Sequence, residues 1–180
     1  AVTLTTTSPA HPESTPPAAL ESPPVLPFVT ALLVLRDGSR WLPEVLDALA
    51  EQQRPPDRLV VLDLASTDGS AALVGDHAAL HAAIPAWRML PQVGDPAASF
   101  EAAIDATVAT LDRPEQAPES ERPEWLWLLP DDCAPAADAL ARLVGAVRRS
   151  PSVGVVGPKV LDWERPRQLL EVGQLLTRSG

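Results

Sequence analysis

Two adjacent carboxylates, Asp131 and Asp132, directly follow the apolar run at residues 124–130 (Glu-Trp-Leu-Trp-Leu-Leu-Pro). Taking two neighbouring carboxylates out of water at the end of a buried strand is costly unless a positive group lies beside them. At the carboxyl edge of an open α/β sheet this group is usually a ligand, and often a divalent metal ion that carries phosphates. The pair therefore predicts chemistry on a metal-bound nucleotide.

Other aspartates follow other apolar runs. Asp37 comes shortly after the run at 29–35 (Val-Thr-Ala-Leu-Leu-Val-Leu), and Asp63 ends the run at 58–63 (Arg-Leu-Val-Val-Leu-Asp). Ligands of open parallel sheets collect beyond the carboxyl ends of the strands, at the point where the strand order reverses. We therefore expect Asp37, Asp63 and the adjacent pair to reach the same edge of one sheet from three strands.

The elements that would position these carboxylates alternate along the chain. Apolar runs predict strands at 29–35, 58–63, 86–90, 125–129 and 153–156, and one or two more within 168–178. Helical spacing of apolar residues predicts helices at 40–53, from the cluster at 66–70 to about residue 80, at 98–111 and at 135–149. This alternation predicts the α/β class, with an open, mostly parallel sheet and helices on both faces.

The first 27 residues differ from the rest in composition. They are rich in Pro, Thr, Ser and Ala, and such a segment cannot bury enough surface to offset its chain entropy. We therefore expect a disordered leader at 1–27 and a single domain at 28–180. A charged surface loop is expected at 112–123.

Charge and cysteine content exclude several classes of function. The formal net charge is −10, Lys159 is the only lysine, and no stretch forms a basic stripe, which argues against nucleic acid as a partner. The single cysteine, Cys133, excludes an internal disulfide or a structural zinc site. No signal peptide or spanning segment is recognisable, so the default expectation is a cytoplasmic setting.

Taken in order, several stretches resemble the opening of family 2 glycosyltransferases, which have the Rossmann-like GT-A fold. These stretches are 29–35, 41–46 with Gln53 and the prolines at 55 and 56, 60–70, 125–135, 155–163 and 170–173. The likeness extends over roughly residues 28–180 in order and spacing. The Asp-x-Asp type motif of that family falls on Asp131 and Asp132.

The resemblance implies an activity and roles for the residues. It implies transfer of a sugar from a nucleotide-diphosphate sugar, with a UDP-sugar favoured, to a glycan or lipid-linked acceptor, as in cell-envelope glycan synthesis. Mg²⁺ or Mn²⁺ would bridge the diphosphate and the Asp131–Asp132 pair. Asp63 would accept a hydrogen bond from the base, Asp37 would border base and ribose, and Asp68 would lie near the base or cap its helix. In a longer protein this domain would lie at the inner face of the membrane.

The chain departs from the family pattern at three places. Leu64 and Ala65 stand where the family usually has Asp and Gly, and Leu129-Pro130 replaces an acidic residue that many members carry before the pair. The catalytic base of inverting members lies well downstream of the motif. The acidic candidates there, Asp162, Glu164 and Glu171, belong to no recognisable base motif. The base therefore remains unknown, and residues 28–180 are expected to be the donor-binding half of a longer protein.

Each of these residues also has a simpler interpretation. Asp131 and Asp132 could favour the start of the following helix through capping and the helix dipole. Asp37 and Asp63 could serve only as turn residues, and the Ser-Thr-Asp-Gly segment at 66–69 is typical of a helix cap. The five tryptophans are expected to pack in the core, with Trp163 kept open because it follows the last predicted strand near the site.

The sequence is also compatible with two other functions. A nucleotidyltransferase would need a Gly-rich, basic phosphate loop after the first strand, and residues 36–40 (Arg-Asp-Gly-Ser-Arg) are a poor version of one. A degenerate, non-catalytic glycosyltransferase-like module would explain the replaced acidic residues. Binding of a triphosphate would favour the first, and partner binding without nucleotide affinity would favour the second.

Overall fold

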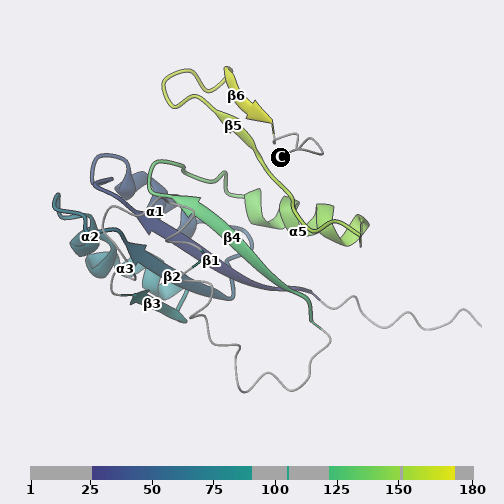
Figure 1. Ribbon diagram of the computed structural model, residues 1–180, viewed down its shortest axis with the longest axis horizontal. Helices are drawn as coiled ribbons and strands as arrows, with labels where there is room; N and C mark the ends of the chain where they lie inside the picture. Colours follow the sequence, from purple (N-terminus) through teal and green to yellow (C-terminus); the bar gives the residue numbers. More distant parts are fainter. Residues whose placement is uncertain (1–25, 91–104, 106–121, 151, 173–180) are drawn as a thin grey trace, which may run out of the picture.

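The computed structural model describes residues 26–90, 105, 122–150 and 152–172 (Figure 1). Its elements are β1 (Phe28–Leu35), α1 (Leu42–Ala50), β2 (Arg58–Asp63), α2 (Ser70–Asp76), α3 (Ala78–Ala83), β3 (Trp87–Leu90), β4 (Glu124–Pro130), α5 (Ala139–Arg149), β5 (Lys159–Leu161) and β6 (Leu169–Val172). The predicted leader lies outside the described residues except for Leu26 and Pro27, and the predicted loop at 112–123 lies outside them except for its last two residues. Among the described helices, none is both long enough and apolar enough to cross a membrane.

The main sheet has four parallel strands in the order β3-β2-β1-β4, which confirms the predicted α/β class. The chain passes from β1 outward to β2 and β3, and then returns to β4 on the other side of β1. The strand order therefore reverses between β1 and β4. Leu35 is level with Asp63 of β2, and Val34 is level with Pro130 of β4, so these three strands end at the same edge.

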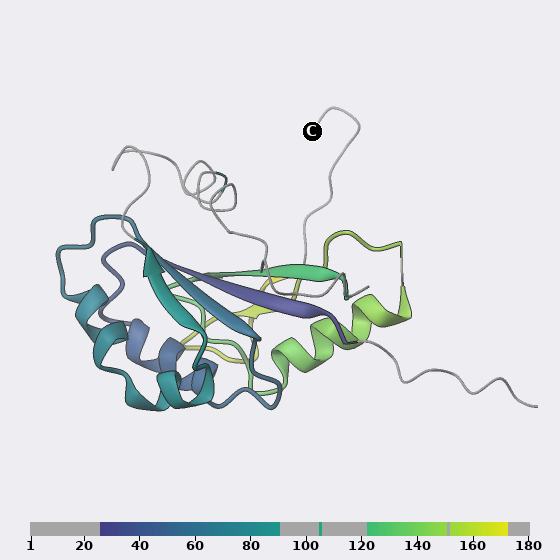
Figure 2. The same ribbon diagram turned by 90° about the horizontal axis from the view of Figure 1, so that it is seen from below.

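Both faces of β1 are buried, which explains its unbroken apolar run. On one face, Leu33 and Leu35 belong to a core shared with Leu46 and Leu49 of α1. All four described helices, α1, α2, α3 and α5, lie on that side of the sheet (Figure 2). The other face buries the alternate residues Leu32 and Val34 of β1 together with Val60 and Leu62 of β2 and Leu64 just after it. The helix predicted at 98–111 lies outside the described residues except for Asp105, which is helical.

The single helix expected to end near residue 80 is instead two helices, α2 and α3, that meet at His77. The Nδ1 atom of His77 accepts a hydrogen bond from the backbone N–H of Leu80, 3.2 Å away, and so caps α3. Its Nε2 atom lies 3.0 Å from the carboxylate of Asp47 on α1. A contact with another helix therefore fixes the break, and helical spacing alone could not reveal it.

Helix α5 begins at Ala139, four residues later than the predicted start at 135. The reason lies in Gln52, a buried residue just after α1. Its amide nitrogen donates to the carbonyl of Ala136 at 2.8 Å, and its amide oxygen accepts from the N–H of Leu140 at 3.2 Å. Backbone groups at Ala136 and Leu140 are thus paired with Gln52, and residues 137 and 138 form a turn before the helix begins.

The strand predicted at 153–156 is wrong. Val155 is 89% exposed, so the apolar residues of this segment are not part of a sheet. The chain instead forms β5 and β6, which pair antiparallel in a separate two-stranded sheet. Strand β6 lies within the predicted segment 168–178, of which residues 173–178 are outside the described part. In Figure 1 this hairpin stands beyond β4 and α5.

Candidate functional site

The structure brings the predicted aspartates to one edge of the sheet. Asp63 ends β2, Asp37 lies just after β1, and Asp131 and Asp132 directly follow β4. The arrowheads of these three strands lie side by side in Figure 1, as their register requires. The edge also contains the reversal between β1 and β4, which is where open α/β sheets bind ligands.

The loops after β1 and β2 are joined through Asp37 and Asp63. The Asp63 carboxylate accepts from the N–H of Ser66 at 3.0 Å, and the Ser66 hydroxyl oxygen accepts from the N–H of Asp37 at 3.1 Å. The Asp37 carboxylate in turn accepts from the N–H of Thr67 at 2.7 Å and from its hydroxyl at 3.2 Å. One oxygen of each carboxylate therefore holds the conformation of the two loops. This is the role that Asp37 and Asp63 would have as turn residues.

Asp68 uses both carboxylate oxygens within the protein. One oxygen accepts from the hydroxyl of Ser70 at 2.6 Å and from its N–H at 3.1 Å, and the other accepts from the N–H of Ser39 at 2.7 Å. These hydrogen bonds, that from the Ser70 hydroxyl above all, hold the pKa of Asp68 well below its usual range. Asp68 thus holds the start of α2 against the loop after β1, although the N-cap residue of α2 is Gly69.

Two non-glycine residues at this edge have left-handed backbone conformations. Asp37 has φ 50° and Ala65 has φ 58°, and each lies in one of the two joined loops. Aspartate tolerates this region, whereas for alanine it costs roughly 1–2 kcal/mol through the clash of Cβ with the following carbonyl. Ala65 occupies the position where the family pattern has glycine. The β2 loop therefore keeps the conformation that glycine would allow, without having glycine.

Replacing Ala65 with glycine should relieve this strain. We expect Ala65→Gly to raise the free energy of unfolding by up to about 1 kcal/mol, because part of the relief is offset by the greater freedom of glycine in the unfolded chain. Ala65→Val should lower the free energy of unfolding by about 1 kcal/mol or more, since a β-branched residue fits this region poorly. Urea denaturation of both variants tests the pair, and equal stabilities would contradict the argument.

Asp131 lies across the strand reversal from the loop after β1. Its carboxylate accepts a hydrogen bond from the N–H of Arg36 at 2.6 Å and lies so close to Gly38 that a Cβ there would overlap it. Burial raises the pKa of Asp131, and the charges of Asp132 and Asp68 add to this effect, while the Arg36 N–H acts against it. Within the described part of the chain no ion pair compensates this carboxylate, and a cation would relieve the cost of its burial.

Asp132 presents its side chain differently. It is exposed, and its carboxylate makes no hydrogen bond with any described residue. Its backbone carbonyl accepts from the indole N–H of Trp163 at 2.7 Å, and the Trp163 ring stacks on Trp41 with centroids 5.2 Å apart. From the sequence, Trp163 is a possible site residue, whereas Trp41 is expected to pack in the core. Trp41 is instead half-buried, in the loop before α1, and stacks at the edge.

The residues fit a divalent ion only in part. Within the described ranges, no group of three or more His, Cys, Asp or Glu side chains could hold a metal ion by itself. Asp131 and Asp132 offer hard carboxylate oxygens, which suit Mg²⁺ or Mn²⁺. Mg²⁺ usually binds to one or two carboxylates and completes its shell with water and phosphate oxygens. The pair therefore fits an ion that arrives with a diphosphate, and does not fit a metal site made by the protein alone.

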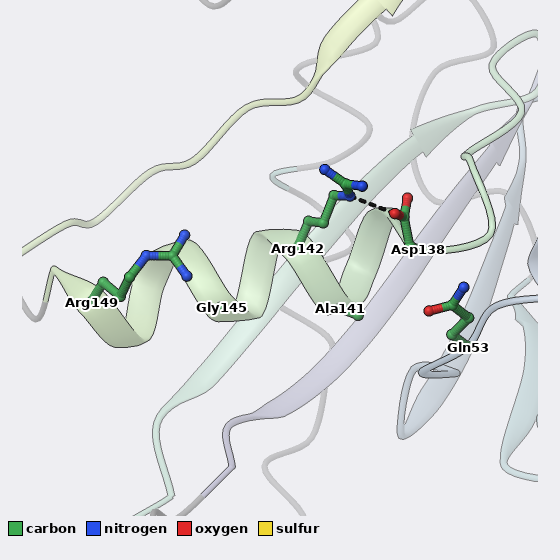
Figure 3. A pocket seen from close by; sticks show the side chains of 6 residues that line it. All are labelled: Gln53, Asp138, Ala141, Arg142, Gly145 and Arg149. Atoms are coloured by element: carbon green, nitrogen blue, oxygen red, sulfur yellow. Dashed lines mark hydrogen bonds and ion pairs between the residues drawn. The ribbon is translucent and has the colours of Figure 1, made fainter.

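A shallow groove with a volume of about 560 Å³ lies elsewhere, between the end of α1 and the helix α5 (Figure 3). Its lining residues are Gln53, Asp138, Ala141, Arg142, Gly145 and Arg149. The side chains of Asp138 and Arg142 form an ion pair at 2.5 Å. None of the predicted aspartates lines this groove, so it is not part of the site at the strand ends.

Comparison with known proteins finds solved structures that share this fold. No protein-family model and no curated protein sequence matches the chain. A mannosyltransferase from Pyrobaculum calidifontis, PcManGT in complex with GDP-Man and Mn²⁺, matches with a TM-score of 0.56 and 24% identity over 76% of this chain and 36% of that one. S. aureus TarS 1-349 in complex with UDP matches with a TM-score of 0.51 and 14% identity over 74% of this chain and 41% of that one.

These identities show a shared fold. The chain spans less than half the length of each of the two structures. The α/β architecture expected from the sequence is thus also that of part of these two proteins. What either protein binds is a property of that protein.

Proposed function

We propose that this chain is the nucleotide-sugar-binding part of a metal-dependent glycosyltransferase of the GT-A type, in family 2. The observation that carries the proposal is the convergence of Asp37, Asp63 and the Asp131–Asp132 pair at one edge, beside the reversal of strand order. The shared fold supports it, because the two similar structures are described with GDP-Man and Mn²⁺ and with UDP.

Each aspartate has a role in this proposal. Asp131 and Asp132 would hold a Mg²⁺ or Mn²⁺ ion, which when bound supplies a Lewis acid for the charge that develops on the leaving nucleoside diphosphate. Asp63 has a second oxygen beyond the one that accepts from Ser66, and would accept a hydrogen bond from the nucleotide base. Asp37 would border base and ribose. Asp68, whose oxygens are both used within the protein, would act through the loops it joins.

The catalytic base remains unassigned. The carboxylate of Asp162 accepts from the N–H groups of Glu164 and Arg165, at 3.0 and 2.8 Å, and so holds the turn between β5 and β6. Glu164 and Glu171 are exposed. A glycan or lipid-linked acceptor, and the group that activates it, would belong to parts of a longer protein that correspond to the rest of the similar structures.

Calorimetric titration with UDP-sugars and GDP-sugars, with and without Mn²⁺, tests the proposal. We expect binding that Mn²⁺ strengthens and that, with Mn²⁺ present, weakens at least about tenfold in Asp132→Ala, since even supporting groups of a metal site contribute that much. Asp76→Ala is the matched control, because Asp76 is an exposed aspartate on α2 without a hydrogen bond to another described side chain. It should bind as the wild type does.

Three results would change this interpretation. Tighter binding of a nucleoside triphosphate than of any nucleotide sugar would favour a nucleotidyltransferase. Binding that is the same with and without Mn²⁺, or that survives Asp132→Ala unchanged, would contradict the metal site. Absence of all nucleotide binding would favour a degenerate module that only binds a partner.

A further inference from the structure

We propose that Trp163 is a positioning residue for the metal-binding pair, and that it holds the Asp132 peptide in place from outside the main sheet. This inference rests on the proposed function. Its indole N–H donates to the backbone carbonyl of Asp132 at 2.7 Å, although the two residues are 31 positions apart in the chain. The contact joins the β5–β6 hairpin to the edge that carries the aspartates.

The turn that presents Trp163 is itself well defined. Asp162, just before it, accepts two backbone hydrogen bonds from the residues that follow Trp163, and its own N–H donates to the carbonyl of Gln168 at 3.0 Å. These hydrogen bonds tie the residue before Trp163 to residues after it, so the connection between β5 and β6 is a closed turn. Trp163 therefore extends from a constrained turn and not from a free loop end.

The indole ring also contacts the loop after β1. Trp163 stacks on Trp41 with an interplanar angle of 23°, and the guanidinium of Arg40 lies 4.3 Å from the centre of the Trp41 ring. The backbone N–H of Trp41 donates to the carbonyl of Gly38 at 2.9 Å, and Gly38 is the residue packed against the Asp131 carboxylate. Stacked aromatic rings add roughly 0.5–1.5 kcal/mol beyond their burial. The Trp163 indole thus contacts Asp132 directly and contacts Trp41, whose neighbour Gly38 packs against Asp131.

This arrangement matters because β4 is an edge strand of the described sheet. On the β1 side, the N–H of Arg36 holds Asp131. For Asp132, the hold among the described residues is the hydrogen bond from Trp163, which the β5–β6 hairpin supplies. Without it, the Asp132 peptide can rotate, and its exposed carboxylate would spend less time in the orientation that binds a metal ion. Groups that orient ligands in this way have measurable effects on metal affinity.

Trp163→Phe tests the proposal because phenylalanine keeps an aromatic ring for the stack and lacks the N–H. The matched control is Trp87→Phe in β3, where an indole is also stacked, on His81, and donates to no described residue. Titration of Mn²⁺ into the full chain saturated with UDP or GDP gives the metal affinity. We expect Trp163→Phe to weaken it about 3- to 10-fold, which corresponds to one hydrogen bond in a metal-site support. Trp87→Phe should leave it unchanged.

A second readout separates positioning from a general loss of structure. The affinity for the nucleotide without Mn²⁺ should be the same in Trp163→Phe and in the wild type. Equal metal affinities for wild type and Trp163→Phe would overturn this inference and leave the proposed function in place. A parallel loss of metal-free nucleotide binding would also overturn it, because the residue would then be structural. A wild-type chain that binds no nucleotide with Mn²⁺ would overturn both.

Discussion

Asp131→Asn should make the metal-free protein more stable at neutral pH and at the same time remove its Mn²⁺-dependent nucleotide binding. The amide keeps an oxygen that can accept from the N–H of Arg36, as the carboxylate does. It also removes a charge that is partly buried and lies close to Asp132 and Asp68. Residues of binding sites often carry such a cost in stability. The loss of metal-dependent affinity should be at least about tenfold.

The sign of the stability change follows from the raised pKa of Asp131. Because the folded chain binds the proton more tightly than the unfolded chain does, the free energy of unfolding falls as the pH rises from the ordinary aspartate pKa of 3.8 through the raised value. The asparagine variant does not lose this contribution. Its advantage over the wild type should therefore be full at pH 7 and shrink as the pH is lowered through that interval.

Thermal or urea unfolding at several pH values, without added metal, measures this advantage. Asp132→Asn is the matched control, since its side chain is exposed and unbonded among the described residues. It should lose metal-dependent binding as well, but gain less stability than Asp131→Asn at pH 7. An Asp131→Asn protein less stable than the wild type at pH 7 would contradict the argument.

Gly38→Ala should damage both the fold and the site. The added Cβ would overlap the Asp131 carboxylate, so the loop after β1 and the end of β4 must move apart. Inserting a methyl group where there is no room costs typically about 1–3 kcal/mol. Gly38 does not have a positive φ, so the cost is steric and not a matter of backbone conformation. We expect a loss of stability in this range and, because Asp131 is displaced, at least about tenfold weaker metal-dependent binding.

Gly75→Ala provides the opposite case in the same protein. Gly75 lies in α2, and a Cβ there would meet no atom within 4 Å. Since alanine favours helix over glycine, this variant should gain about 0.5–1 kcal/mol and bind as the wild type does. Urea denaturation and the same titration compare the two variants. A Gly38→Ala protein with wild-type stability and binding would mean that Asp131 does not need its observed place.

The parallel strands were predictable because burial on both faces leaves a simple mark in the sequence. The runs at 29–35, 58–63 and 86–90 differ from β1, β2 and β3 by at most one residue at an end. The same reasoning failed at 153–156, where valines are frequent but no described strand pairs with the segment and Val155 is exposed. An apolar run shows that a segment can be buried, whereas pairing depends on which other segments are near.

The other differences come from side chains that contact a distant element. Gln52 pairs with the backbone before α5, and His77 separates α2 from α3 while touching α1. Polar residues at such positions look like ordinary surface residues of a helix. Nothing in their local spacing indicates the backbone groups that they bind, so the boundaries of α2, α3 and α5 could not be predicted.

The place of the aspartates was predictable, and the contacts that hold them were not. Strand alternation alone brings Asp37, Asp63 and the Asp131–Asp132 pair to one edge, as the structure shows. The stack of Trp163 on Trp41 could not be foreseen, because the two residues come from elements whose relative position depends on the whole fold. The roles of these residues toward a ligand stay predictions until the titrations are made.

The loops at this edge are joined largely through peptide N–H groups. Arg36, Ser39 and Thr67 each donate a backbone hydrogen to an aspartate from a different part of the chain. Every amino acid except proline has that donor. Mutation at these three positions can therefore change the side chains at this rim while the backbone hydrogen bonds stay in place. If the proposed function holds, evolution or an engineer could change donor preference there without rebuilding the domain.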